Sequence, residues 1–149
     1  MFDIAFTADT PVRDGEGDEA WDGLRGRVTL GDDTEGFRAS LYVWGRGQYE
    51  RQWAEAAGRL LGPPARAGFF TSHFQFWWVM WREGEVVFAQ EHYLTPERLA
   101  GVSRAGAAPY HLIGDRTTWS GDEELPISEW QVTADDIRAF TLRRAGYAE

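Results

Sequence analysis

Residues 69–93 are the stretch that most restricts the fold, because aromatic side chains crowd around a single tight turn. The stretch reads FFTSHFQFWWVMWREGEVVFAQEHY. Aromatic and β-branched residues fit the pleated surface of a sheet, and glycine supplies the positive φ angle that a hairpin turn needs. The stretch therefore predicts two long β-strands joined at residues 82–84, with more aromatic surface than a hairpin core requires.

The register of this hairpin decides which side chains share a face. A two-residue loop of Glu83 and Gly84 would place glutamate where a type I′ turn favours Asn, Asp or Gly. A three-residue loop, Arg82 to Gly84, avoids that position and places Trp81 opposite Glu85. One predicted face is apolar and forms the core: Phe74, Phe76, Trp78, Met80, Val86 and Phe88. The other face is mixed: Gln75, Trp77, Val79, Trp81, Glu85, Val87, Ala89 and Glu91.

Two hypotheses account for the mixed face. A helix lying on Trp77 and Val79 would bury it as a second layer, which is the common arrangement in small domains. Alternatively the face binds a partner, because Trp and Tyr supply large contact areas at interface hot spots. The sequence leaves both hypotheses open.

Composition narrows the class of protein. The chain has 149 residues and no cysteine, and all 15 basic residues are arginine. The absence of cysteine excludes a disulfide framework, a thiol nucleophile and a Cys-based zinc site. No apolar run approaches the length of a membrane span, and the first residues lack the features of a signal peptide. A cytoplasmic protein is therefore expected.

The net charge of −9 is concentrated at the two ends of the chain. Residues 1–24 hold seven acids and one arginine, and the run Asp122-Glu123-Glu124 adds to the acidity of the C-terminal part. Such a balance opposes direct binding of nucleic acid or of an anionic membrane, which clustered Arg and Lys normally mediate. It favours a basic protein partner, although acidity also simply keeps a small protein soluble.

Helical signals occur in three places. Residues 47–61 place apolar side chains at three- and four-residue spacing, and Gly62-Pro63-Pro64 ends that helix. Thr95 and Pro96 begin a short helix that ends near residue 101. Thr133, followed by two acids, is typical of an N-cap and begins the last helix. The apolar residues of this last helix are Ile137, Phe140 and Leu142.

Alternating polarity predicts further strands at residues 2–8, 25–30, 36–43 and 110–113, with an acidic loop over residues 10–23. Ile127 and Trp130 are expected to anchor the loop before the last helix, with Glu129 exposed. No repeat or interdomain linker is visible. The sequence thus predicts one α+β domain over residues 1–149, mainly antiparallel sheet with two or three helices packed on it.

The sequence contains few candidate catalytic residues. His73, His92 and His111 lie on three predicted strands and lack the helical i, i+4 spacing of a zinc motif. Glu91 with His92, or His111 with Asp115, could in principle form an acid/base pair. No nucleophile elbow, P-loop or dinucleotide fingerprint occurs. We expect no metal, no cofactor and no catalysis.

The order of several short motifs is similar to that of a known family. The motifs are Tyr49-Glu50-Arg51-Gln52-Trp53, Phe70-Thr71-Ser72, the Trp-rich strand, Val86-Val87-Phe88-Ala89-Gln90-Glu91, Tyr110 to Arg116, Ile127-Ser128-Glu129-Trp130, and Asp136-Ile137 with Phe140. Together they resemble the immunity proteins of bacterial contact-dependent growth inhibition systems. The resemblance covers roughly residues 47–140. The N-terminal third matches no family we can name, so a different immunity family of polymorphic toxins stays open.

The resemblance implies a non-catalytic cytoplasmic protein that binds a cognate toxin domain and blocks its active surface. Such toxin domains are often nucleases with basic surfaces, which a chain of charge −9 would complement. The partner-binding residues expected on this basis are Trp77, Trp81, Glu85, Glu91, Asp122, Glu123 and Glu124. Two other functions remain open: a carbohydrate or small-ligand module that uses an exposed Trp face, and a small enzyme that uses His92 or His111. The sequence does not give the toxin's activity, the docking face or the oligomeric state.

Overall fold

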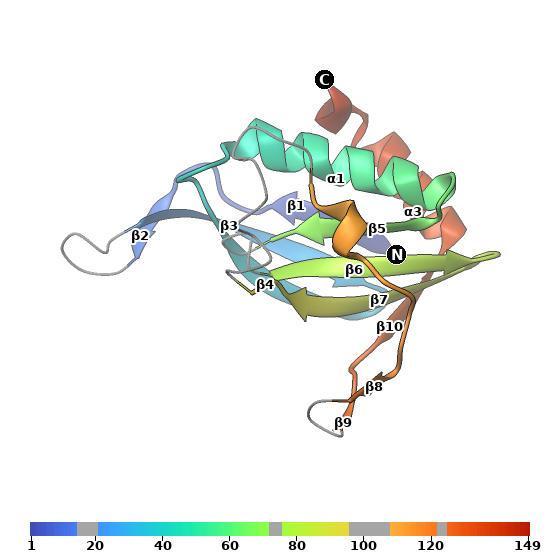
Figure 1. Ribbon diagram of the computed structural model, residues 1–149. Helices are drawn as coiled ribbons and strands as arrows, with labels where there is room; N and C mark the ends of the chain where they lie inside the picture. The colour runs from blue at the N-terminus through green and yellow to red at the C-terminus, as the bar shows by residue number, and fades with distance from the viewer. Residues whose placement is uncertain (15–20, 72–75, 96–107, 122–124) are drawn as a thin grey trace.

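Two antiparallel β-sheets pack face to face, and the two α-helices of the described residues pack along one side of the pair (Figure 1). The computed structural model describes residues 1–14, 21–71, 76–95, 108–121 and 125–149. The predicted α+β class, mainly antiparallel sheet with helices packed on it, is confirmed.

The first sheet contains four strands, and β3 lies at its centre. β3 pairs with β1 and β2 along one edge and with β4 along the other. The strands are β1 (Phe2–Phe6), β2 (Val12–Asp14), β3 (Trp21–Leu30) and β4 (Asp33–Ser40). The expected loop over residues 10–23 is therefore partly wrong, since β2 and the start of β3 pair with each other there.

The second sheet has the order β10-β7-β6-β5. Its strands are β5 (Arg66–Phe70), β6 (Phe76–Glu83), β7 (Val86–Tyr93) and β10 (Trp130–Thr133). β10 was not predicted, because four residues are too few to show an alternating pattern. The inner faces of the two sheets meet in an aromatic core in which the ring of Phe2 lies 5.2 Å from that of Phe69 and 5.0 Å from that of Phe140.

The aromatic hairpin has a different register from the predicted one. Glu83 pairs with Val86, so the loop consists of two residues, Gly84 and Glu85, rather than three. Only Gly84 has a positive φ (63°), as in type II′ hairpins, which carry glycine at the first loop position. Glutamate is therefore not forced into an unfavourable conformation, and the predicted three-residue loop was wrong.

This shift by one residue moves every side chain of β7 to the other face. Phe88, Gln90 and His92 share the outer face of the sheet with the odd-numbered residues of β6. Val87, Ala89 and Glu91 share the inner face with Trp78 and Met80. The mixed face as predicted, with Trp77, Trp81 and Glu91 on one side, does not exist.

Helix α1 (Arg46–Leu61) closes the outer edge of β5 with side chains instead of a strand. The Gln52 amide donates to the Gly68 carbonyl at 2.6 Å and accepts from the Phe70 N–H at 2.9 Å. The Trp53 indole donates to the Phe70 carbonyl at 2.7 Å. The ring of Trp53 also lies 5.0 Å from that of Phe6, so α1 ties the two sheets together.

Helix α3 (Ala134–Arg143) begins at the predicted N-cap, where the Thr133 hydroxyl accepts from the Asp136 N–H at 3.0 Å. Ile137 and Phe140 are buried, but Leu142 is 80% exposed, which contradicts its predicted core position. Two residues after Phe140, the helix has turned by about 200°, so Leu142 points away from the core.

Two smaller features complete the described chain. Residues 110–112 form a short 3-10 helix, η2 (Tyr110–Leu112), instead of the predicted strand, because a short apolar run does not distinguish the two. β8 (Trp119–Ser120) and β9 (Leu125–Pro126) form a ribbon, and η3 (Ala145–Ala148) follows α3. The helix predicted at residues 95–101 falls almost entirely outside the described residues. None of the described helices is long and apolar enough to cross a membrane.

Candidate partner-binding surface

The two tryptophans expected at the binding surface are buried. Trp77 is 2% exposed and Trp81 is 7% exposed. The Trp77 ring stacks on Phe70 at 5.0 Å, and the Trp81 indole donates to the Gly114 carbonyl at 3.0 Å. The segment that carries η2 therefore covers this face, as the two-layer hypothesis required, and the exposed Trp face expected for a ligand-binding module is wrong.

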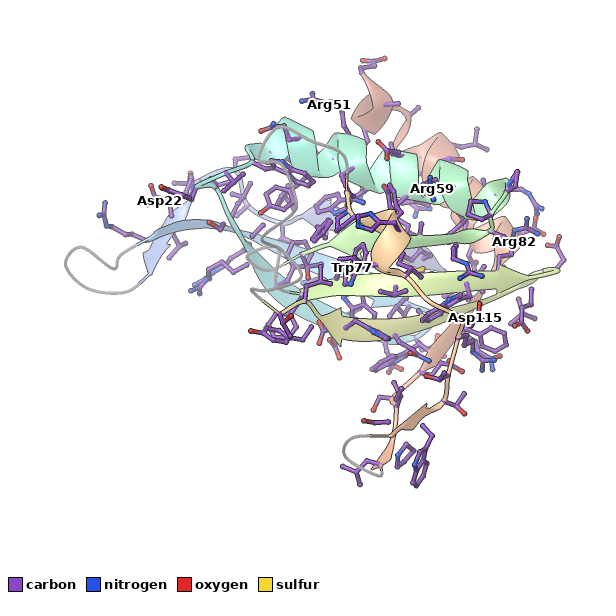
Figure 2. All side chains as sticks on the ribbon, viewed as in Figure 1. Asp22, Arg51, Arg59, Trp77, Arg82 and Asp115 are labelled. Carbon is purple, nitrogen blue, oxygen red and sulfur yellow. The ribbon has the colours of Figure 1, made fainter. Side chains whose placement is uncertain are left out.

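A cavity of about 350 Å³ remains between this segment and the outer face of the second sheet. Trp77 and Asp115, both labelled in Figure 2, line it. The lining residues include Val79, His92, Tyr93 and Ile113. The Asp115 carboxylate at its rim lies 3.3 Å from a guanidinium nitrogen of Arg66 and is thus part of an ion pair.

A chain of hydrogen bonds orients His92. The buried Gln90 amide nitrogen donates to the Thr117 carbonyl at 2.8 Å and to the Glu129 carboxylate at 2.7 Å. Its oxygen is consequently an acceptor, so His92 Nε2, at 2.8 Å, is the donor in that contact. Glu91 points to the opposite face of β7 and does not form the acid/base pair considered from the sequence. Among the described residues, no group of three His, Asp or Glu side chains could hold a metal ion.

Glu129 is largely buried, although it was expected to be exposed. Its carboxylate accepts two hydrogen bonds from Arg116, at 2.8 and 2.5 Å, and one from Gln90. The guanidinium of Arg116 lies 3.5 Å from the ring centre of Phe88. The hydrogen bond from Arg116 is the main reason why the pKa of Glu129 is lowered, since it favours the ionised form. Sequence gave no signal for this contact, which joins residues on three separate segments.

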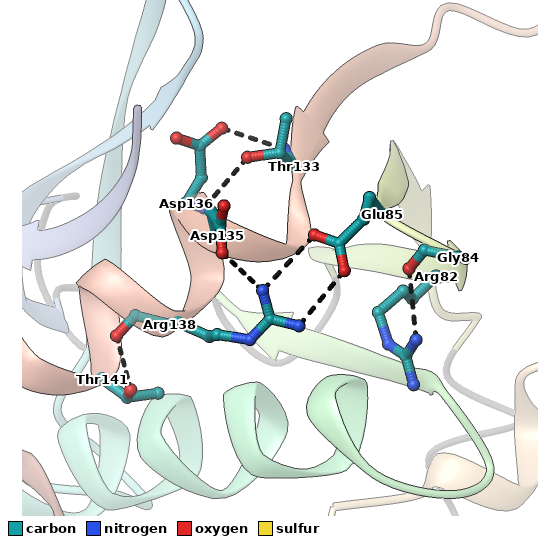
Figure 3. A network of polar contacts seen from close by, with 8 residues as sticks. All are labelled: Arg82, Gly84, Glu85, Thr133, Asp135, Asp136, Arg138 and Thr141. Carbon is teal, nitrogen blue, oxygen red and sulfur yellow. Dashed lines mark hydrogen bonds and ion pairs between the residues drawn. The ribbon is translucent and has the colours of Figure 1, made fainter.

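Glu85 lies at the tip of the hairpin, where it binds helix α3 (Figure 3). Each of its carboxylate oxygens lies 3.3 Å from a different guanidinium nitrogen of Arg138. Arg138 also binds Asp135, at 2.5 Å, and the Glu85 carbonyl accepts from the Ala134 N–H. Glu85 is 67% exposed, but Arg138 already neutralises part of its charge.

Glu91 is an exposed carboxylate whose charge is poorly compensated. Partial burial, and then repulsion from Glu35 on β4, raise its pKa above the ordinary value. The Trp130 indole nearby donates to the Asp33 carboxylate at 3.0 Å. The side of the molecule where β4 meets β7 therefore carries negative charge that the described residues do not neutralise.

Asp122, Glu123 and Glu124 lie outside the described residues, but the ribbon that flanks them is described. In this ribbon Trp119 pairs with Pro126 and Ser120 with Leu125. Figure 1 shows the ribbon projecting from the side of the sheets that lies opposite α1. Trp119 and Leu125 are each 56% exposed.

Sequence reasoning missed the exposed Trp119. The signal for it is weak: a tryptophan between Thr118 and Ser120, in a stretch without other large apolar residues before Leu125. Large apolar side chains that stay exposed on a monomer commonly mark a protein contact, and tryptophan is enriched at the centres of such contacts.

Comparison with known proteins gives concordant matches. The family model of the CdiI N-terminal domain matches residues 39–140. The curated "Immunity protein CdiI" of Enterobacter cloacae subsp. cloacae is 26% identical over 120 residues, which is 76% of this chain and 81% of the relative. A chain in the solved "CdiA-CT/CdiI toxin and immunity complex from Enterobacter cloacae" superposes with a TM-score of 0.82. That match has 24% identity and covers 98% of this chain and 99% of the other, so the shared fold includes the N-terminal third.

Proposed function

The chain belongs to the CdiI N-terminal domain family of immunity proteins from contact-dependent growth inhibition systems, and we propose that it binds and neutralises a cognate toxin domain without catalysing a reaction. The solved structure that the chain resembles is described as a toxin and immunity complex, which supports a toxin as the partner. The absence of cysteine suits a cytoplasmic site of action.

The observation that carries this proposal is the projecting ribbon with its exposed Trp119 and Leu125. Most other large aromatic side chains that the structure describes are buried or half-buried, and Tyr42 and Tyr93 are the other exposed ones. An indole that projects from the body of the molecule can enter a pocket on another protein and bury much of its surface there.

The charge of the chain supports a basic partner, and a nuclease is the class of toxin that we propose. A nuclease domain needs a positive surface for its substrate, and a protein of charge −9 is drawn to such a surface. We assign this contact to Glu91, to Glu85 and to the acids at residues 122–124. Trp77 and Trp81 contribute indirectly, by supporting the sheet from which Glu91 projects.

Co-expression tests the proposal. The chain is produced together with the toxin domain encoded beside it, and growth and co-purification are scored. We expect growth to be restored and the two proteins to purify together. An unrestored culture in which both proteins are soluble but separate would reject the immunity function.

A pair of charge reversals tests the acidic contact separately. Glu91→Arg should lower the association rate with the toxin and weaken its dependence on salt, because long-range attraction sets that rate. Asp22→Arg is the matched control, since Asp22 is also exposed but lies on β3 six residues before Val28, the strand partner of Glu35, and so away from the acidic side that holds Glu91. Equal rates for both variants at low salt would remove Glu91 from the interface.

A further inference from the structure

The outer face of the first sheet is positively charged, in contrast to the rest of the chain. Strand register places Arg25 directly opposite Arg38, and Arg27 opposite Gly36 in the next pair of the same face. The acid on this face among the described residues of β1, β3 and β4 is Asp3, which binds Arg144 at 2.7 Å and Arg143 at 3.3 Å. Three arginines therefore share the centre of an open sheet face.

The pairing of Arg25 with Arg38 is unfavourable when taken by itself. Like charges directly opposite each other on neighbouring strands are unfavourable, and Arg25 and Arg38 form such a pair. Within the described part of the chain, neither Arg25 nor Arg27 forms an ion pair, although the sequence has nine more acids than arginines. A local arrangement that disfavours the fold is often a functional one.

The shape of the face suits a ligand that enters between the guanidinium groups. The lining of a shallow hollow of about 710 Å³ includes the three arginines, Thr7, Thr34 and Gly36, together with Gly26 and Phe37. Gly36 keeps the hollow open because it has no side chain. A β-carbon at this position would meet only the Gly26 carbonyl, at 3.8 Å, so the fold itself does not require glycine there.

The charge of the whole chain restricts the partner. Arginine binds carboxylates and phosphates through paired N–H groups. A nucleic acid carries charge along its whole length and would be repelled by the acidic surfaces around a patch of three arginines. A second copy of the chain would bring together two molecules of net charge −9. A short carboxylate-rich segment of another protein avoids both penalties.

We propose that the outer face of the first sheet, with Arg25, Arg27 and Arg38 around Gly36, binds a carboxylate-rich segment of the cognate toxin. The inference rests on the proposed immunity function and adds to it a second contact, of opposite charge to the first. An acidic contact and a basic contact together fix the orientation of two proteins, because rotating the partner would bring groups of like charge next to each other.

Two variants that act by different means test this assignment. Arg25→Gln with Arg27→Gln removes charge from the face, and Gly36→Val fills the hollow without changing charge. Each is expected to weaken binding of the purified toxin domain by about tenfold. The control is Arg51→Gln, because Arg51 is exposed on the side of α1 that faces away from the sheets (Figure 2). This control should bind within about twofold of the unmodified chain, the size expected for a single charge outside the interface. Thermal melting verifies that all three variants are folded.

The outcomes separate the two proposals. Failure of the unmodified chain to bind the toxin would reject the immunity function and this contact together. Normal toxin binding by both the double variant and Gly36→Val would reject this contact alone. Two further measurements test other partners. Binding of a 20-nucleotide single-stranded RNA tests for nucleic acid, and sedimentation of the chain by itself tests for self-association. RNA binding or self-association that the arginine substitutions abolish, with toxin binding unchanged, would also overturn the assignment.

Discussion

The indole of Trp77 lies against Gly68 on the neighbouring strand, in the space that a β-carbon at residue 68 would occupy. Glycine at this position lets the ring lie flat on the outer face of the second sheet. The ring then supports the segment that closes over it. This contact explains why a tryptophan that sequence placed on a mixed face is buried.

Gly68→Ala should destabilise the protein by about 1–3 kcal/mol, because an added methyl group in a tightly packed site displaces its neighbours. Gly58→Ala is the control. Gly58 lies within α1 with open space around its α-carbon, and alanine favours a helix more than glycine does. Urea unfolding of both variants measures the difference. A Gly68 variant as stable as the Gly58 variant would contradict the packing described.

Gln52→Leu should cost about 2–4 kcal/mol of unfolding free energy, since the Gly68 carbonyl and the Phe70 N–H would lose their side-chain partner in a buried place. Leucine keeps most of the volume, so the loss reports hydrogen bonding rather than a cavity. Gln131→Leu, at an exposed position of β10, serves as the comparison and should change stability by less than about 0.5 kcal/mol. Similar losses in the two variants would show that the edge of β5 does not need Gln52.

Glu129→Gln should lower stability at pH 7 by about 1–2 kcal/mol and should flatten its fall in acid. The pKa of Glu129 is lower in the folded state, mainly through Arg116. Its stabilisation is therefore complete above the unfolded pKa of about 4.3 and is lost as pH falls through the folded value. Unfolding free energies between pH 7 and pH 3 measure this effect. Asp22→Asn, an equal change of charge at an exposed site, should leave the slope intact.

Glu91→Gln should raise the free energy of unfolding at neutral pH, whereas Glu129→Gln should lower it. The pKa of Glu91 is raised in the folded state, so its contribution favours folding below the unfolded pKa and is lost as pH rises through the folded value. Removing the charge should raise stability at pH 7 by a few tenths of a kcal/mol, the scale of exposed charges, and should slow toxin association. A gain no larger than that of Asp32→Asn, in thermal melts at pH 7, would show that Glu35 does not repel it.

Trp119→Ala should weaken toxin binding by about 2 kcal/mol or more, because a central tryptophan dominates many interfaces. The melting temperature should stay within about 2 °C of the unmodified value, since the side chain is already exposed. Calorimetric titration gives the affinity. As the comparison, Tyr42→Ala removes an aromatic side chain that is 79% exposed, more than Trp119, from the β4–α1 connection. If the two variants bind equally well, the ribbon is not an anchor.

Features that depend on local sequence were predictable. The helical spacing of Tyr49, Trp53 and Leu60 gave α1 to within one residue at its start, and Thr133 with Asp136 gave the start of α3. Both signals are complete within a few residues. The hairpin was also recognised, but its register depended on whether Gly84 came first or last in the loop.

The candidate site was less predictable, because contacts between distant segments create it. Trp77 and Trp81 are buried by residues 110–117, and Glu129 is held by Arg116 and Gln90. No periodicity in the sequence links these segments. The three arginines of the first sheet likewise share a face only because β3 pairs with β4 in a particular register.

The side chains of Gln52 and Trp53 have a consequence for how long this protein can persist in a cell. A neutralising protein has to be present before any toxin arrives, and it therefore spends most of its lifetime without its partner. The free backbone of β5 would offer a template for copies to join through their strands and form aggregates. The Gln52 amide and the Trp53 indole occupy the hydrogen-bonding groups of Gly68 and Phe70. The protein can therefore accumulate in the cell without its partner and without aggregating through this edge.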